Sequence, residues 1–348
     1  MPTVRPFAAL RYDPAVAGPL DRLVAPPYDV ISDEARRDYL ARSPYNVVHL
    51  TLPDSEEQAA RDLAAWRAQR ALVEAPPSYW WVAQDYTGPD GVARTREGFA
   101  AAVEAVPYER GDVLPHERTH AGPKVGRLRL LRATRTQLEP IFLLYDEEPK
   151  LTRPAGEPDL DVTEGGVRTR VWAVPGGEVE IGTPLLVADG HHRYETAVAF
   201  RAEDPSATHT FAILVSARAP GLEIFPTHRV VQRVGHVPGE PVDSPDGGVT
   251  LYKGNGQFVR VRSEDDFGPR VVESFRPEGV TYTAYAEEAI ATVDRGEAQA
   301  AFLLQPVTVE QVARFAHAGE TMPQKSTFFY PKLTSGLLLF PLAPEQAR

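Results

Sequence analysis

The residues with the clearest chemical potential follow a short apolar run in PLLVADGHHRYETAVAF, residues 184–200. Leu185 to Val187 are typical of a buried strand, and Gly190 permits a tight turn that a side chain would obstruct. The pattern from Tyr194 onward predicts an amphipathic helix, so the polar residues lie at its N-terminus. Free backbone N–H groups and the positive end of the helix dipole make such a place suitable for an anion.

The side chains of this turn add charge to the anion site. Arg193 offers a planar guanidinium that matches phosphate oxygens, and Asp189 offers a carboxylate for Mg²⁺ or a hydroxyl group. His191 and His192 add two titratable imidazoles. The alternative is that both histidines only cap the helix. Asp-Gly-His-His-Arg together at one strand–helix junction favours a functional site.

A second polar cluster lies in LPHERTHAGPK, residues 114–124. His116 and His120 have a spacing that would suit zinc on a helix, but the prolines and the glycine of this stretch predict a loop. A loop with these histidines, Glu117 and Lys124 could close over a phosphorylated ligand. A solvated loop without function is the equal alternative.

A third candidate is Asp29, which follows the rigid Pro-Pro pair of APPYDVIS, residues 25–32. It could be a catalytic carboxylate held in fixed geometry. The chemistry alone favours the simpler reading, an acid that stabilises the N-terminus of the following helix. Pro26–Pro27 is also a candidate for a cis peptide bond.

Lysines and hydroxyl groups gather in PQKSTFFYPKLTSG, residues 323–336. Lys325 and Lys332 suit phosphate, whereas the aromatic residues of this stretch form either a ligand wall or part of the core. In FPTHRVV, His228 and Arg229 begin a predicted strand and either line the same cleft or lie on the surface.

Composition restricts the classes of function. The 348 residues are 43% hydrophobic, enough for a substantial core, and the net charge of −11 disfavours nucleic acid and anionic membranes as partners. The chain has no cysteine, which excludes disulfides, thiolate metal sites and a cysteine nucleophile. No segment is typical of a signal peptide or a membrane span, so we expect a cytoplasmic protein. The P-loop, Rossmann and nucleophile-elbow motifs are all missing.

Periodicity predicts mixed elements with short strands, and hence an α+β fold, also described as mixed α/β, and no regular βαβ series. The predicted helices cover residues 33–42, 55–73, 124–137, 285–295 and 308–318. The predicted strands cover residues 4–12, 46–52, 78–87, 96–106, 140–146, 170–174, 185–188, 209–217, 222–234 and 300–307.

Several of these stretches, in this order, resemble a known family. They look like the bacterial and archaeal proteins grouped as domain of unknown function 1015, over residues 2–340. The family name implies no function. The motifs are RPFAALRYDP, APPYDVIS, HERTHAGPKVGRLRLLRAT, PIFLLY, ADGHHRYETAVAFR, FPTHRVV and PQKSTFFYPKLTSG.

The Asp-Gly-His-His-Arg turn is also similar to the phosphate-binding turn of the ParB/sulfiredoxin-like superfamily, where members bind nucleotides. One branch phosphorylates free serine with an Asp-Gly-His-x-Arg turn. This resemblance implies that Asp189 helps to place Mg²⁺ or the acceptor hydroxyl. It also implies an acidic general base early in the chain, for which Asp29 and Glu34 are candidates. The residues implied to hold nucleotide phosphates are Gly190, His191, His192 and Arg193.

The resemblance further implies a ParB/sulfiredoxin-like nucleotide-binding region over residues 1–240, with an insertion at about 53–180. Residues 241–348 would then form a C-terminal α/β region packed on it. The leading hypothesis is a small-molecule kinase that uses ATP or ADP with Mg²⁺, with free L-serine as the first acceptor. Further ligand contacts would come from His116, Glu117, Lys124, His228, Lys325 and Lys332.

Two alternatives belong to other classes. One is a nucleotide-binding regulatory module without turnover. The other is a histidine-based phosphatase or phosphotransferase, with His191 or His192 as the nucleophile. Homo-oligomerisation is left open.

Overall fold

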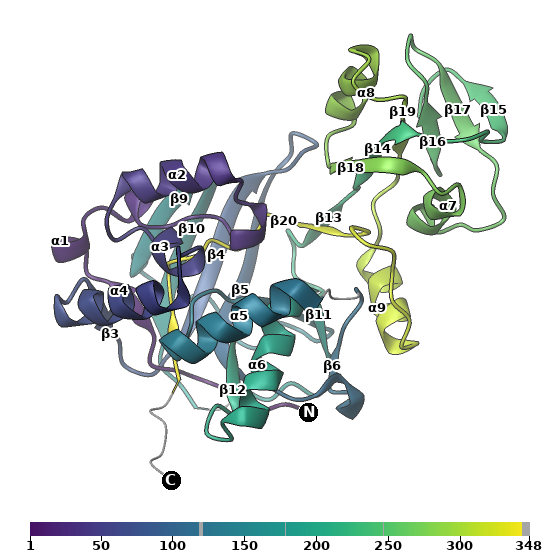
Figure 1. The fold of residues 1–348 in the computed structure, drawn as a ribbon. Coiled ribbons are helices and arrows are strands. Elements are labelled where there is room, and N and C mark those ends of the chain that lie inside the picture. The colour runs from purple at the N-terminus through teal and green to yellow at the C-terminus, as the bar shows by residue number, and fades with distance from the viewer. Residues whose placement is uncertain (118–120, 178, 246, 343–348) are drawn as a thin grey trace.

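The computed structural model describes residues 1–117, 121–177, 179–245 and 247–342, and within them one sheet of nine strands and one of six organise the chain (Figure 1). The six-stranded sheet stands to one side of the larger body, as Figure 1 shows. The α+β, or mixed α/β, class predicted from the sequence is therefore confirmed.

The larger sheet is mixed, because β8 pairs antiparallel with β11 and parallel with β12. The strands predicted over 78–87 and 96–106 lie near its centre, where β4 and β5 pair antiparallel along their length. Its strands, in spatial order, are β6 (Val113–Leu114), β11 (Leu185–Asp189), β8 (Ile141–Tyr145), β12 (His209–Ser216), β5 (Ala93–Glu104), β4 (Tyr79–Thr87), β10 (Val167–Val174) and β9 (Leu160–Glu164), and β1 (Val4–Arg5) pairs with β5.

Both faces of this sheet are buried, and successive side chains of a strand serve opposite faces. Trp80 belongs to the cluster on one face, with Phe142 and Phe329. Trp81 belongs to the cluster on the other face, with Tyr194. A strand buried on both faces carries a nearly continuous apolar run, which is what the sequence of β4 shows.

The C-terminal segment returns to the larger sheet after the smaller one. Two short antiparallel pairs anchor it, β20 (Phe328–Tyr330) with β13 (Glu223–Phe225) and β21 (Phe340–Pro341) with β7 (Thr136–Gln137). Between them, Ser335 forms a backbone bridge with Ala25. The segment carrying Lys332 is thus fixed at both ends.

The smaller sheet has its own apolar core. In spatial order its strands are β15 (Gly239–Val242), β17 (Phe258–Val261), β16 (Thr250–Tyr252), β19 (Ala300–Leu303), β14 (His228–Arg233) and β18 (Glu278–Thr283). One cluster joins its strands to α7 (Gly268–Ser274) and another joins them to α8 (Ala286–Asp294). The boundary at residue 240, with the insertion at 53–180, stays a prediction.

The remaining elements surround the larger sheet. The helices are α1 (Pro14–Ala17), α2 (Asp33–Arg42), α3 (Val48–Thr51), α4 (Glu56–Ala68), α5 (Ala121–Thr134), α6 (His191–Glu203) and α9 (Val309–His317). The 3₁₀ turns are η1 (Leu20–Arg22), η2 (Tyr28–Val30) and η3 (Tyr108–Arg110). A short antiparallel pair joins β2 (Leu10–Tyr12) to β3 (Leu72–Glu74). Over the described ranges we find no helix with the length and apolar character needed to cross a bilayer.

Three expectations about local structure are wrong. Residues 46–52 were expected to form a strand, but Val48–Thr51 is a helical turn, because Asn46 Oδ1 accepts the Val48 N–H at 3.0 Å and so starts it. The expected strand over 4–12 is interrupted from Pro6, which has no N–H group for a ladder, to Ala9. Among the described residues the cis peptide bond precedes Pro331, and Pro26–Pro27 is trans.

Candidate functional site

The predicted strand, tight turn and helix form as expected, as β11, Gly190 and α6. Asp189 is the last residue of β11, and Gly190 caps α6 with φ of +92°, a left-handed conformation that glycine adopts without strain. A Cβ on Gly190 would lie 3.1 Å from the guanidinium of Arg193. Glycine is therefore favoured by the backbone conformation, and a side chain at this position would crowd the Arg193 guanidinium.

Asp189 is held between two cations from different parts of the chain. Arg193 Nη2 donates to Asp189 Oδ2 at 2.9 Å, and Lys332 Nζ donates to Asp189 Oδ1 at 2.8 Å. Burial alone would raise the pKa of Asp189, but the charges of Lys332 and Arg193 outweigh it and hold the pKa below its ordinary value. Asp189 is therefore a carboxylate at neutral pH.

Arg193 does not present a free fork to a ligand. Its Nη1 donates to the carbonyl oxygen of Pro140, which directly precedes β8, while Nη2 is paired with Asp189. The predicted phosphate contact would therefore require this guanidinium to share or leave its present acceptors.

The two histidines closest to Asp189 are buried and neutral. His116 Nδ1 donates to the Val187 carbonyl at 2.7 Å, which leaves Nε2 to accept from the Thr327 hydroxyl at 3.0 Å. Burial lowers the pKa of His116 to about 4. The His191 ring lies 4.7 Å from that of His116, and burial lowers the pKa of His191 well below its ordinary value.

These contacts change the roles expected of the histidines. His191 Nε2 accepts the backbone N–H of His116 at 3.4 Å, so this nitrogen is already used and is not presented as a nucleophile. His192 lies in the first turn of α6, is partly exposed, and accepts a hydrogen bond from Thr196 at 2.7 Å through its carbonyl oxygen. At neutral pH the site gains no positive charge from His116 or His191.

Glu117 is a second carboxyl group beside this cluster. Its backbone bridges to Met322, whose N–H donates to the His116 carbonyl at 2.8 Å. Burial raises the pKa of Glu117, and the neighbouring Lys325 only partly offsets this. The side chain of Lys325 is exposed, so an ammonium group accessible to ligands lies close to a carboxyl of raised pKa.

Lys124 faces a different part of the molecule from Lys332. Its ammonium pairs with Glu195 of α6 at 2.6 Å. Both residues line an open hollow of about 730 Å³ next to α6. Glu117 also lines this hollow, and the charge of Asp189 acts on its carboxyl group. The other lining residues include Tyr108, Glu109, Pro115, Val125, Thr196 and Thr321.

Asp29 and Glu34 are both exposed, on η2 and in the first turn of α2. Burial would lower the pKa of Arg193, but Asp189 and, more weakly, Asp29 raise it. Asp29 therefore lies within the electrostatic reach of the turn.

His228 is not brought to the cluster. It lies on β14 of the smaller sheet, where Nδ1 accepts the Leu304 N–H at 3.1 Å. His120 lies outside the described residues.

Sequence reasoning missed Glu139. This buried carboxylate accepts the Tyr28 N–H at 3.0 Å and the Ser335 hydroxyl at 2.9 Å, and it lies 4.0 Å from Arg127. It therefore joins the Pro-Pro turn to the C-terminal segment beside Asp189. A signal was available, because Glu139 stands between an apolar residue and the buried strand PIFLLY.

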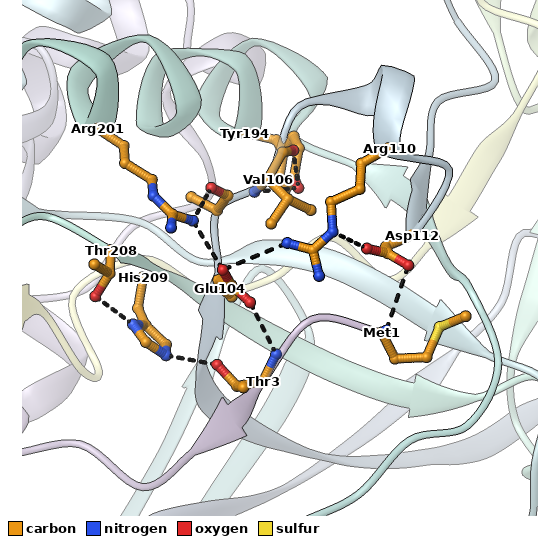
Figure 2. A network of polar contacts seen from close by, with 11 residues as sticks. Met1, Thr3, Glu104, Val106, Arg110, Asp112, Tyr194, Arg201, Thr208 and His209 are labelled. Atoms are coloured by element: carbon orange, nitrogen blue, oxygen red, sulfur yellow. Dashed lines mark hydrogen bonds and ion pairs between the residues drawn. The ribbon is translucent and has the colours of Figure 1, made fainter. Parts of the chain in front are cut away.

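A separate polar network fastens α6 to β5 and the chain start (Figure 2). Glu104 of β5 accepts from Arg201 at 3.1 Å and lies 3.6 Å from Arg110. The Tyr194 hydroxyl donates to the Val106 carbonyl at 2.7 Å, as Figure 2 shows. These contacts fix the orientation of the helix whose first turn carries the candidate site.

The comparison with protein families gives a clear match. One family model matches residues 4–242, which is more than half of the chain. The chain belongs to the family described as "Protein of unknown function (DUF1015)". The matched part of this DUF1015 protein contains Asp189, His116 and Glu117, whereas Lys325 and Lys332 lie beyond it.

Solved structures show a weaker likeness to this DUF1015 protein, each at 13% identity. A free serine kinase in complex with AMP has a TM-score of 0.38 and covers 64% of this chain and 87% of its own. SbnI from Staphylococcus aureus with a C-terminal truncation has a TM-score of 0.42, and the match covers 67% of this chain and 84% of SbnI. A conserved hypothetical protein from Pyrococcus furiosus has a TM-score of 0.37, and the match covers 68% of this chain and 90% of that protein. No curated protein matches the chain.

The expected resemblance to free serine kinases is thus found, but likeness at this level says nothing of activity. The site itself also limits the predicted metal role of Asp189. Both of its carboxylate oxygens already hold cations, and no group of three metal-ligating side chains occurs among the described residues. In this arrangement Asp189 does not fit a protein-held Mg²⁺.

Proposed function

We propose that this DUF1015 protein transfers a phosphoryl group from ATP or ADP to a hydroxyl group of a small metabolite, with free L-serine as the first acceptor to test. The observation that carries the proposal is Asp189 held between Arg193 and Lys332 at the N-terminus of α6. The N-terminus of α6 and the Lys332 ammonium meet there, and backbone N–H groups beside a lysine are a combination that binds phosphate.

The local charge supports this proposal against the background of the whole chain. The protein carries a net charge of −11, yet cationic side chains outnumber carboxylates around the turn. A local excess of positive charge on an acidic protein favours a bound anion. The five cations are Arg96, Arg127, Arg193, Lys325 and Lys332, and the four carboxyl groups are Asp29, Glu117, Glu139 and Asp189.

Lys332 is the cation best able to serve an incoming phosphate. Its side chain is 22% exposed and has a flexible stem, so the ammonium can turn from Asp189 to a phosphate oxygen. Arg193, fixed to a carbonyl oxygen as well, then stays as the partner that keeps Asp189 charged. Exposed Lys325 supplies a further phosphate contact.

The acceptor would enter from the hollow beside α6, because Glu117 lines both that hollow and the edge of the charged cluster. Asp189 has a lowered pKa and Glu117 a raised one. Carboxyl groups whose environments separate their pKa values in this way take different roles in acid–base catalysis. We therefore assign proton transfer from the acceptor hydroxyl to Glu117, with Asp29 as the alternative base.

The experiment is incubation with ATP or ADP, Mg²⁺ and a pool of hydroxyl metabolites that includes L-serine, with mass spectrometry of the products. Lys332→Met tests the site, and Lys253→Met, at an exposed lysine directly after β16 of the smaller sheet, is the matched control. We expect a phosphorylated metabolite from the wild-type protein and from K253M, and a strong loss in K332M. Equal product from all three proteins would contradict the site assignment.

One observation favours a second function, nucleotide binding without turnover. Because both oxygens of Asp189 are occupied, the turn offers phosphate-binding cations while Asp189 itself is not free to hold a catalytic metal. Calorimetry with ADP separates the two functions. Binding without any product from the metabolite pool would support the binding module, and binding with product would support the kinase.

A further inference from the structure

Arg96 of β5 is a buried cation beneath the segment that carries Lys332. Only 2% of the residue is exposed, and its guanidinium lies over the Phe142 ring at 4.5 Å. Its Nη2 donates to Gln84 Oε1 at 2.5 Å and to the Pro331 carbonyl at 2.7 Å. Arg96 thus contacts the C-terminal segment directly from the larger sheet.

Two successive carbonyl groups of that segment are held in the same way. Arg96 holds the Pro331 carbonyl, and Gln84 Nε2 donates to the Lys332 carbonyl at 3.2 Å. Since Arg96 and Gln84 also bond to each other, they form one unit on adjacent strands. This unit fixes the backbone from which the Lys332 side chain reaches Asp189.

The charge of Arg96 is not needed for holding a carbonyl group. Its Nη1 is buried without a hydrogen-bond partner, and within the described part of the chain no carboxylate forms an ion pair with it. A buried charge without a partner is costly, and a neutral amide could donate the same bond to Pro331. Asp189 is the carboxylate whose charge reaches Arg96.

We propose that Arg96 is a positioning residue of the candidate site: it holds the Pro331–Lys332 backbone so that the Lys332 ammonium reaches Asp189 and the place of an incoming phosphate, and its unpaired charge adds to the attraction of the site for phosphate. The first part concerns the protein alone. The second part rests on the proposed function.

Lysine-selective NMR tests the first part. The chain has five lysines, so ¹³Cε-lysine labelling gives few signals, and K332R identifies that of Lys332. We expect Arg96→Met to move the Lys332 signal toward its position in Asp189→Asn. Arg229→Met is the matched control, because Arg229 is also buried with an unpartnered nitrogen but lies in the smaller sheet. An unmoved Lys332 signal in folded R96M would overturn the proposal.

Calorimetry with ADP tests the second part. We expect R96M to weaken ADP binding by about tenfold or more, R96K to recover part of the affinity, and R229M to change little. Equal weakening in R96M and R229M would overturn the electrostatic role. If the wild-type protein binds no ADP, the proposed function and this second part fail, while the NMR result still decides the positioning role. If R96M does not fold, R96K decides both measurements.

Discussion

Lys332 and Asp189 are 143 positions apart in the sequence, and their side chains meet at 2.8 Å. The pair joins the predicted phosphate-binding turn to the C-terminal segment, which lies outside the part of the chain matched by the family model. The candidate site therefore depends on the return of residues 323–342 to the larger sheet.

Replacing Lys332 by methionine should destabilise the protein by about 1–3 kcal/mol at pH 7, because Asp189 loses one of two charged partners in a largely buried position. The pKa of Asp189 lies below its unfolded value, so the stability it contributes is present above about pH 4 and is lost as pH falls further. Urea unfolding at pH 7 and pH 3 measures the free energy of unfolding. K332M should be less stable than K253M at pH 7, and the gap in stability should be smaller at pH 3. An equal gap at the two pH values would contradict the prediction.

Gly190→Ala should disturb the turn itself. The alanine would adopt φ of +92°, which costs about 1–2 kcal/mol, and its Cβ would lie 3.1 Å from the Arg193 guanidinium. We expect both lower stability in urea and weaker ADP binding, because Arg193 is pushed from Asp189. Gly235→Ala is the control, since a Cβ there meets no atom within 4 Å. The same unfolding midpoint for both variants would show that the turn tolerates a side chain.

Much of the turn could be predicted from the sequence because its determinants are local. An apolar strand, a glycine and an amphipathic helix follow one another within 184–200, so the position of Asp189 follows from the order of residues. The helix at Asp33–Arg42 is also local, with Ser32 accepting the Ala35 N–H at 3.2 Å as its cap.

The partners of the turn could not be predicted, because they depend on packing between distant segments. Nothing in the order of residues indicates that Lys332 reaches Asp189, or that Glu139 accepts from both Tyr28 and Ser335. The protonation state of the histidines could not be predicted from the sequence either, because it follows from their burial. His116 looked like a loop residue and is one of the most buried side chains of the site.

Glu117→Gln should lower the rate of phosphoryl transfer by about 100-fold or more while ADP affinity stays within a few fold, because a general base contributes roughly that factor. Burial raises the pKa of Glu117, so the wild-type rate should fall when the pH drops below that raised value. Steady-state kinetics from pH 5 to pH 8 measures both. Asp29→Asn is the comparison, and a larger loss of rate in D29N than in E117Q would assign the base to Asp29.

His209 predicts a dependence of stability on acid that is independent of the candidate site. Its ring lies between the Thr3 and Thr208 hydroxyls at 3.0 and 2.7 Å (Figure 2). Burial lowers its pKa to about 4, below the unfolded value of about 6.5. The unfolded state therefore binds the proton first, and stability falls as pH drops from about 6.5 to about 4.

His209→Gln should remove this contribution, which we expect to be on the order of 1–3 kcal/mol between pH 7 and pH 4. Thermal unfolding across this range should show a shallower loss of stability in H209Q than in the wild-type protein. His236→Gln, at an exposed position, should follow the wild-type curve. If H209Q loses stability as steeply as H236Q does, the buried imidazole is not a source of the acid sensitivity.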